Sequence, residues 1–414
     1  MPLDPGGYVV SDRPPQEATL SRSIPAHPNP DMLVWARETA RLSVESAAQR
    51  LHVGAAELEA WEHGQAGLTV AKLQNMADLY RRPLAAFFLS ERPDVPERVR
   101  DFRRPWRAGQ YPESPNLAAE IRRAEAQREN VLEILDLRDE APSGMWRTPA
   151  AEHDMESYAR VMLDEHALVK RPGPSGKPTD WFFYWSSALE EVGVLVVTAT
   201  RVPSAEADGF SIAFDPVPVI AVNGGTHFNR RIFTLLHEYA HLLANTSALC
   251  DLHEDSRTPR DVDRLEVECN RIAAEILVPS AKFATRPIVT QASKNQENWP
   301  LATLREEARV WGVSPEVILR KLVTHQRASK SFYDAWRDAR SEDDRYSSGS
   351  DARANGGGDG LRTKVRNLGK GYVRSVVGAL SEGYLTTYET SNMLNAKVDQ
   401  IPKMLARARV PEVD

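Results

Sequence analysis

The sequence has few cysteines, no long apolar run and no excess of basic charge. Its two cysteines, Cys250 and Cys269, are not accompanied by a signal-peptide pattern at the start of the chain, so we expect a reduced, cytoplasmic protein. The longest apolar stretches, Leu84 to Leu89 and Val192 to Val197, are far shorter than the roughly 20 residues of a membrane helix, so no membrane partner is expected. The net charge of -6 excludes a uniformly basic nucleic-acid coat and restricts any DNA contact to a local surface.

The 414 residues are enough for two or three domains, each with its own core. With 42% hydrophobic and 27% charged residues, the composition is globular and excludes collagen-like and fully disordered chains. The apolar spacing predicts a multidomain, mainly α protein whose central α+β domain contains a small sheet. The predicted parts are an extended proline-rich tail (1–30), an all-α domain (31–91), a basic connector (92–115), the central domain (116–340), a flexible linker (341–360) and a small basic helical segment (361–414).

Within the central domain, helical periodicity and β-branched runs separate the expected helices from the expected strands. A hairpin is predicted where residues 210–214 and 217–222 flank the Asp215-Pro216 turn, and a further buried strand is predicted at 194–198. The expected helices cover residues 116–139, 181–192, 230–245, 262–277, 301–311 and 315–325.

The run His237-Glu238-Tyr239-Ala240-His241 carries the clearest chemical signal in the chain. Two imidazoles at i and i+4 lie on one face of a helix, about one turn apart, so both can bind one Zn²⁺ ion. Zinc with an open position lowers the pKa of a bound water, and a glutamate beside the first histidine can accept the proton of that water. The same pattern also occurs by chance on surface helices. The apolar residues around it favour a metal site, because a polar cluster in a buried helix needs partners.

The third ligand is expected on the helix at 262–277. Glu266 and Asn270 lie on one face of that helix, so the carboxylate can bind zinc while the amide orients a histidine ring. Glu268 points about 160° away from Glu266 and is a weaker alternative. The segment between the two helices holds further rivals, Cys250, His253, Glu254 and Asp255, whereas Cys269 is interpreted as a small buried residue.

These motifs resemble the ImmA/IrrE family of zinc metallopeptidases. Residues 231–243 resemble its arginine, lead-in and HExxH helix, residues 266–279 resemble its E-x-x-x-N segment, and residues 209–212, 220–223, 311–314 and 319–322 resemble its flanking strands and closing helices. The resemblance covers roughly residues 180 to 325 and implies a zincin-like fold. It also implies zinc on His237, His241 and Glu266, with Glu238 as general base. Ala240 stands where family members often have glycine, and Tyr239 and His253 are the candidates for stabilising an oxyanion.

The resemblance also suggests a function. The best understood members are cytosolic, site-specific enzymes that cleave helix-turn-helix repressors of stress-response or mobile-element genes. It therefore implies a zinc-dependent endopeptidase that cleaves a repressor or partner protein in a stress, phage or mobile-element circuit. The alternative is a transcriptional regulator or antitoxin-like protein that binds DNA and a cognate toxin. A scaffold with neither activity is the third hypothesis.

Residues 31–91 resemble an XRE-type helix-turn-helix, with Ser43 as a helix N-cap and His52-Val53-Gly54 as the turn. The most plausible DNA contacts are Arg37, Arg41, Gln49 and Arg50. However, residues 55–62 carry three glutamates and no basic residue, so a dimerisation or partner-binding role, including a homodimer, is an equal alternative. The C-terminal segment has nine Lys and Arg against five Asp and Glu, and residues 386–405 are interpreted as a helical hairpin for packing or partner binding.

Overall fold

The computed structural model describes residues 24–93, 114–147, 154–204, 206–246, 259–347 and 360–409. Side chains are described for these residues except 245–246, 259–263 and 340–347. The chain divides into two compact units, Met1–Asp94 and Val95–Asp414. Each unit has a hydrophobic core of its own.

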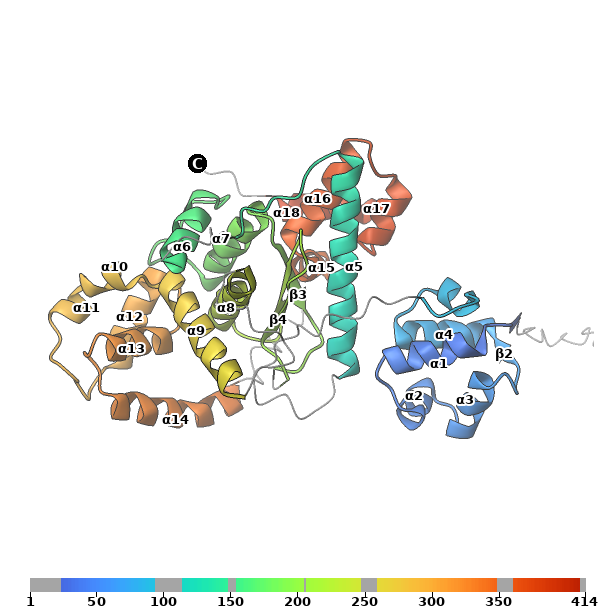
Figure 1. The fold of residues 1–414 in the computed structure, drawn as a ribbon, viewed down its shortest axis with the longest axis horizontal. Coiled ribbons are helices and arrows are strands. Elements are labelled where there is room, and N and C mark those ends of the chain that lie inside the picture. The colour runs from blue at the N-terminus through green and yellow to red at the C-terminus, as the bar shows by residue number, and fades with distance from the viewer. Residues whose placement is uncertain are drawn as a thin grey trace, which may run out of the picture. The chain divides into compact units, whose positions relative to one another are not determined.

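The first unit is a small bundle of short helices. Ser43 caps α2 by accepting the Ser46 N–H at 3.2 Å, as predicted. The helix ends at the predicted break, where His52 takes the left-handed conformation. The helices are α1 (Pro30–Thr39), α2 (Val44–Leu51), α3 (Ala55–Glu62), α4 (Val70–Tyr80) and the 3-10 turn η1 (Leu84–Phe88) (Figure 1).

The N-terminal boundary differs from the predicted one. Strand β1 (Pro25–Ala26) pairs with β2 (Leu68–Thr69) in an antiparallel ribbon, and Ala26 belongs to the core of this unit. Residues 24–30 are therefore part of the first unit, because this strand pair and the Asn29 cap of α1 fix them. The rest of the expected tail, most of the basic connector and most of the expected linker lie outside the described residues.

The second unit is built around a three-stranded sheet with the order β3-β5-β4. Strand β3 (Leu195–Ala199) runs parallel to β5 (Val219–Asn223), and β4 (Gly209–Ile212) pairs with β5 in the antiparallel direction. The predicted hairpin between residues 210–214 and 217–222 is confirmed. Every residue of the three strands is buried, which shows that both faces of the sheet are covered.

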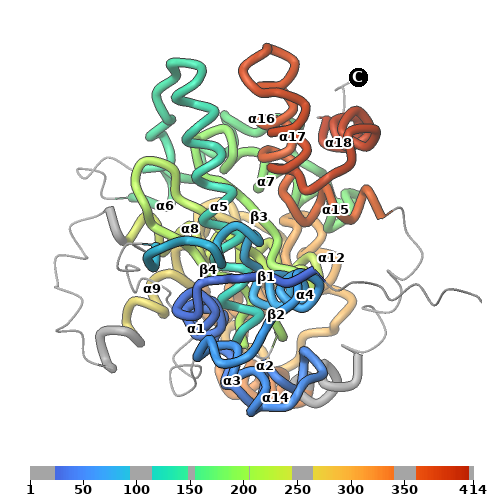
Figure 2. Tube along the Cα trace, turned by 90° about the vertical axis from the view of Figure 1, so that its right-hand side faces the viewer, coloured from blue at the N-terminus to red at the C-terminus, as the bar shows by residue number. Residues whose placement is uncertain are grey.

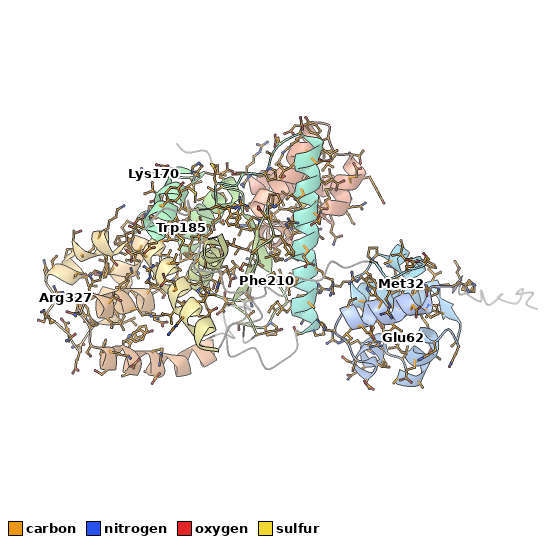
Figure 3. The ribbon with its side chains drawn as sticks, viewed as in Figure 1. Met32, Glu62, Lys170, Trp185, Phe210 and Arg327 are labelled. Atoms are coloured by element: carbon orange, nitrogen blue, oxygen red, sulfur yellow. The ribbon has the colours of Figure 1, made fainter. Side chains whose placement is uncertain are left out.

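Alternate strand residues enter two different cores. Val196 and Ile220 face a large helical core, whereas Val197 and Val219 face a second core that includes α5. Figure 3 labels Trp185 among the helices of the first core and Phe210 on the α5 side of the sheet. The helices that contribute to the first core are α6 (Met155–Glu165), α7 (Pro178–Glu191), α8 (Phe228–Thr246), α9 (Pro259–Leu277), α10 (Ser280–Ala284), α11 (Pro287–Thr290), α12 (Leu301–Trp311), α13 (Pro315–Thr324) and α14 (Lys330–Ser347).

The C-terminal segment does not form a separate module, contrary to the prediction. Its helices join α5 (Pro115–Leu137) in the second core and cover the other face of the sheet, as Figures 1 and 2 show. These helices are α15 (Gly360–Leu368), α16 (Lys370–Ser381), α17 (Thr387–Met393) and α18 (Ile401–Ala408), with the 3-10 turn η5 (Val398–Gln400). The sequence indicates only the local helical spacing of this segment. Its packing against the sheet joins residues far apart in the sequence, which local spacing does not reveal.

Two further elements differ from expectation. Helix α14 continues to Ser347, so the predicted linker cannot begin at residue 341. Helix α6 was not predicted, although Asp154 caps it by accepting the Ser157 N–H. Across the described ranges, no helix is both long and apolar enough to cross a bilayer.

Candidate metal centre

Helix α8 holds the HExxH residues in fixed positions. Its start is anchored by Arg231, which donates to the backbone oxygens of Thr226, at 2.7 Å, and Gly224. The apolar residues Ile232, Leu235 and Leu236 pack into the core. His237 and His241 project from the same face of the helix, as the i, i+4 spacing predicts.

The three expected ligands come together between α8 and α9. The Nε2 atoms of His237 and His241 are 3.1 Å apart, and each lies 3.3 Å from an oxygen of Glu266. Tetrahedral zinc with bonds of about 2.0–2.1 Å would place its donor atoms roughly 3.3–3.4 Å apart. These residues therefore fit a zinc ion, and among the described residues they form the candidate metal cluster.

The electrostatics of the cluster suit a cation. Burial raises the pKa of Glu266, but hydrogen bonds to His237 and His241 outweigh it and hold that pKa at about 2. Burial lowers the pKa of His237, but the hydrogen bond to Glu266 and the charges of Glu238 and Glu266 outweigh it, so the pKa is raised. Glu266 is thus an anion that attracts positive charge to the two rings.

Of the alternative ligands, Glu268 is described by the structure and does not join the cluster. Glu268 instead forms an ion pair with Arg271 at 2.7 Å on another face of α9. Cys250, His253, Glu254 and Asp255 lie outside the described residues.

Glu238 is 5% exposed and is held by strand β4. Its Oε2 accepts a hydrogen bond from the Ser211 hydroxyl at 2.9 Å. Gly209 makes this approach possible, because a Cβ there would lie 2.6 Å from the Thr234 side chain and 2.8 Å from the Ala221 carbonyl oxygen. The base candidate is therefore positioned by the sheet as well as by its own helix.

Sequence reasoning missed Ser211 and a second contact at the cluster. The Sγ of Cys269, which is fully buried, lies 3.3 Å from Nδ1 of His241. Strand alternation could have identified Ser211, since Phe210 and Ile212 face the second core and Ser211 must face α8. Asn270, expected to orient a histidine, donates its amide to the backbone oxygen of Glu266 at 2.8 Å. Its role toward a ring stays a prediction.

The oxyanion candidates receive no support from their positions. The Tyr239 hydroxyl is buried and donates to the backbone oxygen of Trp146 at 2.8 Å, so it serves packing and is not directed to the cluster. His253 lies outside the described residues. Ala240 is fully buried in the first core, where its methyl group fits.

The proposed DNA contacts lie in the first unit and differ in their exposure to solvent. Arg41, Gln49 and Arg50 are exposed. Arg37 has only 12% of its side chain exposed and forms a bidentate pair with Glu62, at 2.7 and 3.0 Å. This pair holds α1 against α3 and occupies the guanidinium, so Arg37 is a poor candidate for a phosphate contact. It also neutralises one of the three glutamates that weakened the DNA interpretation.

Comparison with known proteins places the cluster in a recognised domain. A peptidase family model described as the IrrE N-terminal-like domain matches residues 189–323, which contain both helices of the candidate metal cluster. This stretch of the chain is similar to the ImmA/IrrE family, in agreement with the motifs of the sequence. The radiation response metalloprotease IrrE of Deinococcus deserti is 37% identical over 135 residues, which are 32% of this chain and 44% of that protein. This chain thus spans less than half of that relative, and no solved structure matches it. The matched residues include β3 to α13, and the helices α5, α6 and α14 to α18 lie outside the match.

Proposed function

We propose that this protein is a zinc-dependent, site-specific endopeptidase. The observation that carries the proposal is the convergence of His237, His241 and Glu266 at donor separations of 3.1–3.3 Å, next to a buried Glu238. Bound at these three residues, zinc would supply a Lewis acid and lower the pKa of water. The match to a peptidase domain supports the same reaction class.

The residues of the chain have distinct roles in this proposal. Glu238 is the group that accepts a proton from the attacking water, and the Ser211 hydroxyl fixes its orientation. The buried contact between Cys269 and His241 limits rotation of that ring. Because Glu238 is shielded by the sheet and α8, a substrate that fills the site would leave little bulk water around the carboxylate.

The protein substrate in this proposal is a helix-turn-helix repressor or another partner protein of a stress, phage or mobile-element circuit. The first unit, with a capped α2 and a left-handed His52 before α3, supports a helix-turn-helix module in the same chain. Exposed Arg41, Gln49 and Arg50 support contacts with DNA, whereas the absence of a basic residue on α3 favours a protein partner. Gel shifts with operator fragments at low salt test the DNA contact. If the protein binds none of the fragments, the proposed contact is refuted.

Cleavage of a repressor encoded beside the gene tests the enzyme proposal. The zinc-loaded protein should cleave this repressor at one position. The Glu238→Gln variant should bind zinc as wild type does but should not cleave the repressor. Glu268→Gln is the matched control, because Glu268 lies outside the cluster and should leave cleavage unchanged. Equal processing by wild type and Glu238→Gln would refute the proposal and favour the regulator or antitoxin-like alternative.

A further inference from the structure

A cleft of about 1540 Å³ opens beside the metal cluster in the second unit. Phe233 lines it and stacks on the ring of His237, with ring centroids 6.2 Å apart. Asn270 also lines it, one helical turn after Glu266. Residues four apart share one face of a helix, so the cleft continues the faces of α8 and α9 that carry the cluster. The three ligands do not themselves line the cleft, but a chain lying in it would pass within one helical turn of His237 and Glu266.

Part of the cleft wall comes from helices outside the matched family domain. Arg337 on α14 and Arg366 on α15 both line it. The segment that carries Arg366 is fixed to the sheet through the second core, so its position is set by the fold. The cleft is thus formed by the matched domain together with helices outside the match.

The lining of the cleft is strongly basic. Two glutamates, Glu275 and Glu316, are the acidic residues in the described lining, and Glu275 is already paired with Lys321. Seven basic residues line the same cleft: Arg230, Arg231, Arg271, Arg320, Lys321, Arg337 and Arg366.

Some of these charges are balanced by acids and others are not. Arg230 pairs with Asp208 at 2.6 Å, and Arg271 pairs with Glu268 at 2.7 Å. Arg337 makes a longer contact of 3.4 Å with its exposed neighbour Asp338. Arg320, in contrast, contacts the ring of Tyr333 and forms no ion pair within the described residues. Its exposed guanidinium is available to an incoming anion.

Arg231 and Arg366 form a second unbalanced group. Arg231 donates to backbone carbonyls, and burial together with the charge of Arg366 lowers its pKa to about 10. The Nε of Arg366 is buried without a hydrogen-bond partner in the described part of the chain. The two positively charged guanidinium groups repel each other, and no carboxylate among the described residues pairs with either of them. Such a pair favours the binding of an anionic ligand.

The part of the cleft nearest to the cluster has a different character. Val267 is 69% exposed, and Phe233 beside His237 is half-buried. Both are apolar and both line the cleft, so this part suits an apolar side chain.

We propose that the cleft binds an extended polypeptide segment that carries acidic side chains on one side of an apolar residue. The apolar residue lies at Val267 and Phe233, and the acidic side chains face Arg320, Arg337 and Arg366. This proposal rests on the proposed peptidase function and names the substrate class of that site. A nucleic acid would also satisfy the positive charge, but the apolar part and its continuity with the cluster favour a peptide.

A binding assay with full-length Glu238→Gln, which needs no turnover, tests the proposal. The probes are a short labelled peptide with leucine at its centre and glutamates toward one end, a twin with glutamine in place of each glutamate, and a labelled single-stranded DNA. Arg320→Gln with Arg337→Gln removes two exposed charges from the cleft. The matched control is Arg305→Gln with Arg309→Gln, two exposed residues of α12 that do not line the cleft.

The acidic peptide should bind more tightly than its glutamine twin, and the advantage should decrease with added NaCl. The cleft variant should lose about tenfold in affinity for the acidic peptide, whereas the control variant should not. Equal binding of the two peptides, or equal loss in both variants, would overturn the proposal, as would binding of the DNA but not of the peptide. Because cleavage is not measured, failure of the peptidase function leaves this result unaffected and is detected separately by the repressor assay.

Discussion

At the scale of single residues, the action of Glu238 depends on a partner that the motif does not contain. The carboxylate is buried and its hydrogen bond from Ser211 comes from a strand about 27 residues earlier in the chain. A single hydrogen bond to a charged group contributes about 1.5–3 kcal/mol. The orientation of the base is therefore sensitive to a small change on β4.

Replacing Ser211 with alanine should lower kcat for repressor cleavage by about tenfold or more while KM and zinc content stay close to wild type. The reason is that Glu238 keeps its charge but loses its fixed orientation. Ser187→Ala is the control, because Ser187 is also buried but bonds to a backbone oxygen within α7. A fall in kcat of the same size in both variants would show that Ser211 acts through stability alone.

Sequence patterns predicted that His237, His241 and Glu266 would lie together, as they do, but predicted little of their surroundings. His237, His241 and Glu266 follow from i, i+4 spacing and the E-x-x-x-N segment, both of which are local. Cys269, which was interpreted as a small buried residue, also contacts His241, and this contact depends on how α9 packs on α8. The Arg37 and Glu62 pair likewise joins two helices, so the sequence could not show that Arg37 is occupied.

At the scale of elements, the hairpin and the long helices were predictable because their periodicity is strong. The bounds of α12 agree with the predicted residues, and α8 and α9 differ from theirs by a few residues at the ends. The runs at 195–199 and 219–223 are apolar on both faces, a pattern that requires two covering layers. The identity of the second layer was not predictable, since it pairs residues more than 150 positions apart.

A buried carboxyl joins the two layers at α7 and α16. Glu190 accepts from the Gly371 N–H at 3.1 Å and pairs with Arg374 at 3.1 Å, with Lys370 and Glu191 nearby. Burial raises the pKa of Glu190 to about 7, and the charge of Arg374 only partly opposes this shift.

This pKa predicts a loss of stability as pH rises. In the unfolded chain the carboxyl titrates near 4.5, so between 4.5 and about 7 the folded form retains a proton that the unfolded form has lost. The free energy of unfolding should fall across this window by up to about 3 kcal/mol and then level off. Glu190→Gln mimics the protonated form and should lack this component. Urea unfolding of wild type and Glu190→Gln at several pH values measures this component. If the free energies of unfolding of the two proteins differ by the same amount at every pH, Glu190 is not the group responsible.

At the scale of the whole molecule, the second unit is a single folding body whose two cores share one sheet. Residues 360–409 contribute about half of the buried residues of the second core. Each large apolar side chain in such a core contributes about 1.5–3 kcal/mol, and a domain has only about 5–15 kcal/mol of net stability. The unit therefore cannot lose its C-terminal helices and stay folded.

A chain of residues 95–347 alone, which lacks both the first unit and the C-terminal helices, should show neither a cooperative thermal transition nor near-ultraviolet circular dichroism. Removal of residues 1–94 should leave both intact, because the first unit has its own core and the second keeps all of its own. A cooperative transition in residues 95–347 alone would show that residues 360–409 form a separable module.

The most direct test of the account is the zinc content of the purified full-length chain, compared with two glutamate variants of α9. The account predicts about one zinc ion per chain in wild type and in Glu268→Gln, and strongly weakened binding in Glu266→Gln, because, of these two glutamates, Glu266 joins the two histidines and Glu268 pairs with Arg271. Zinc content that is unchanged in Glu266→Gln, or absent from folded wild-type protein supplied with zinc, would contradict the assignment of this cluster as the metal centre.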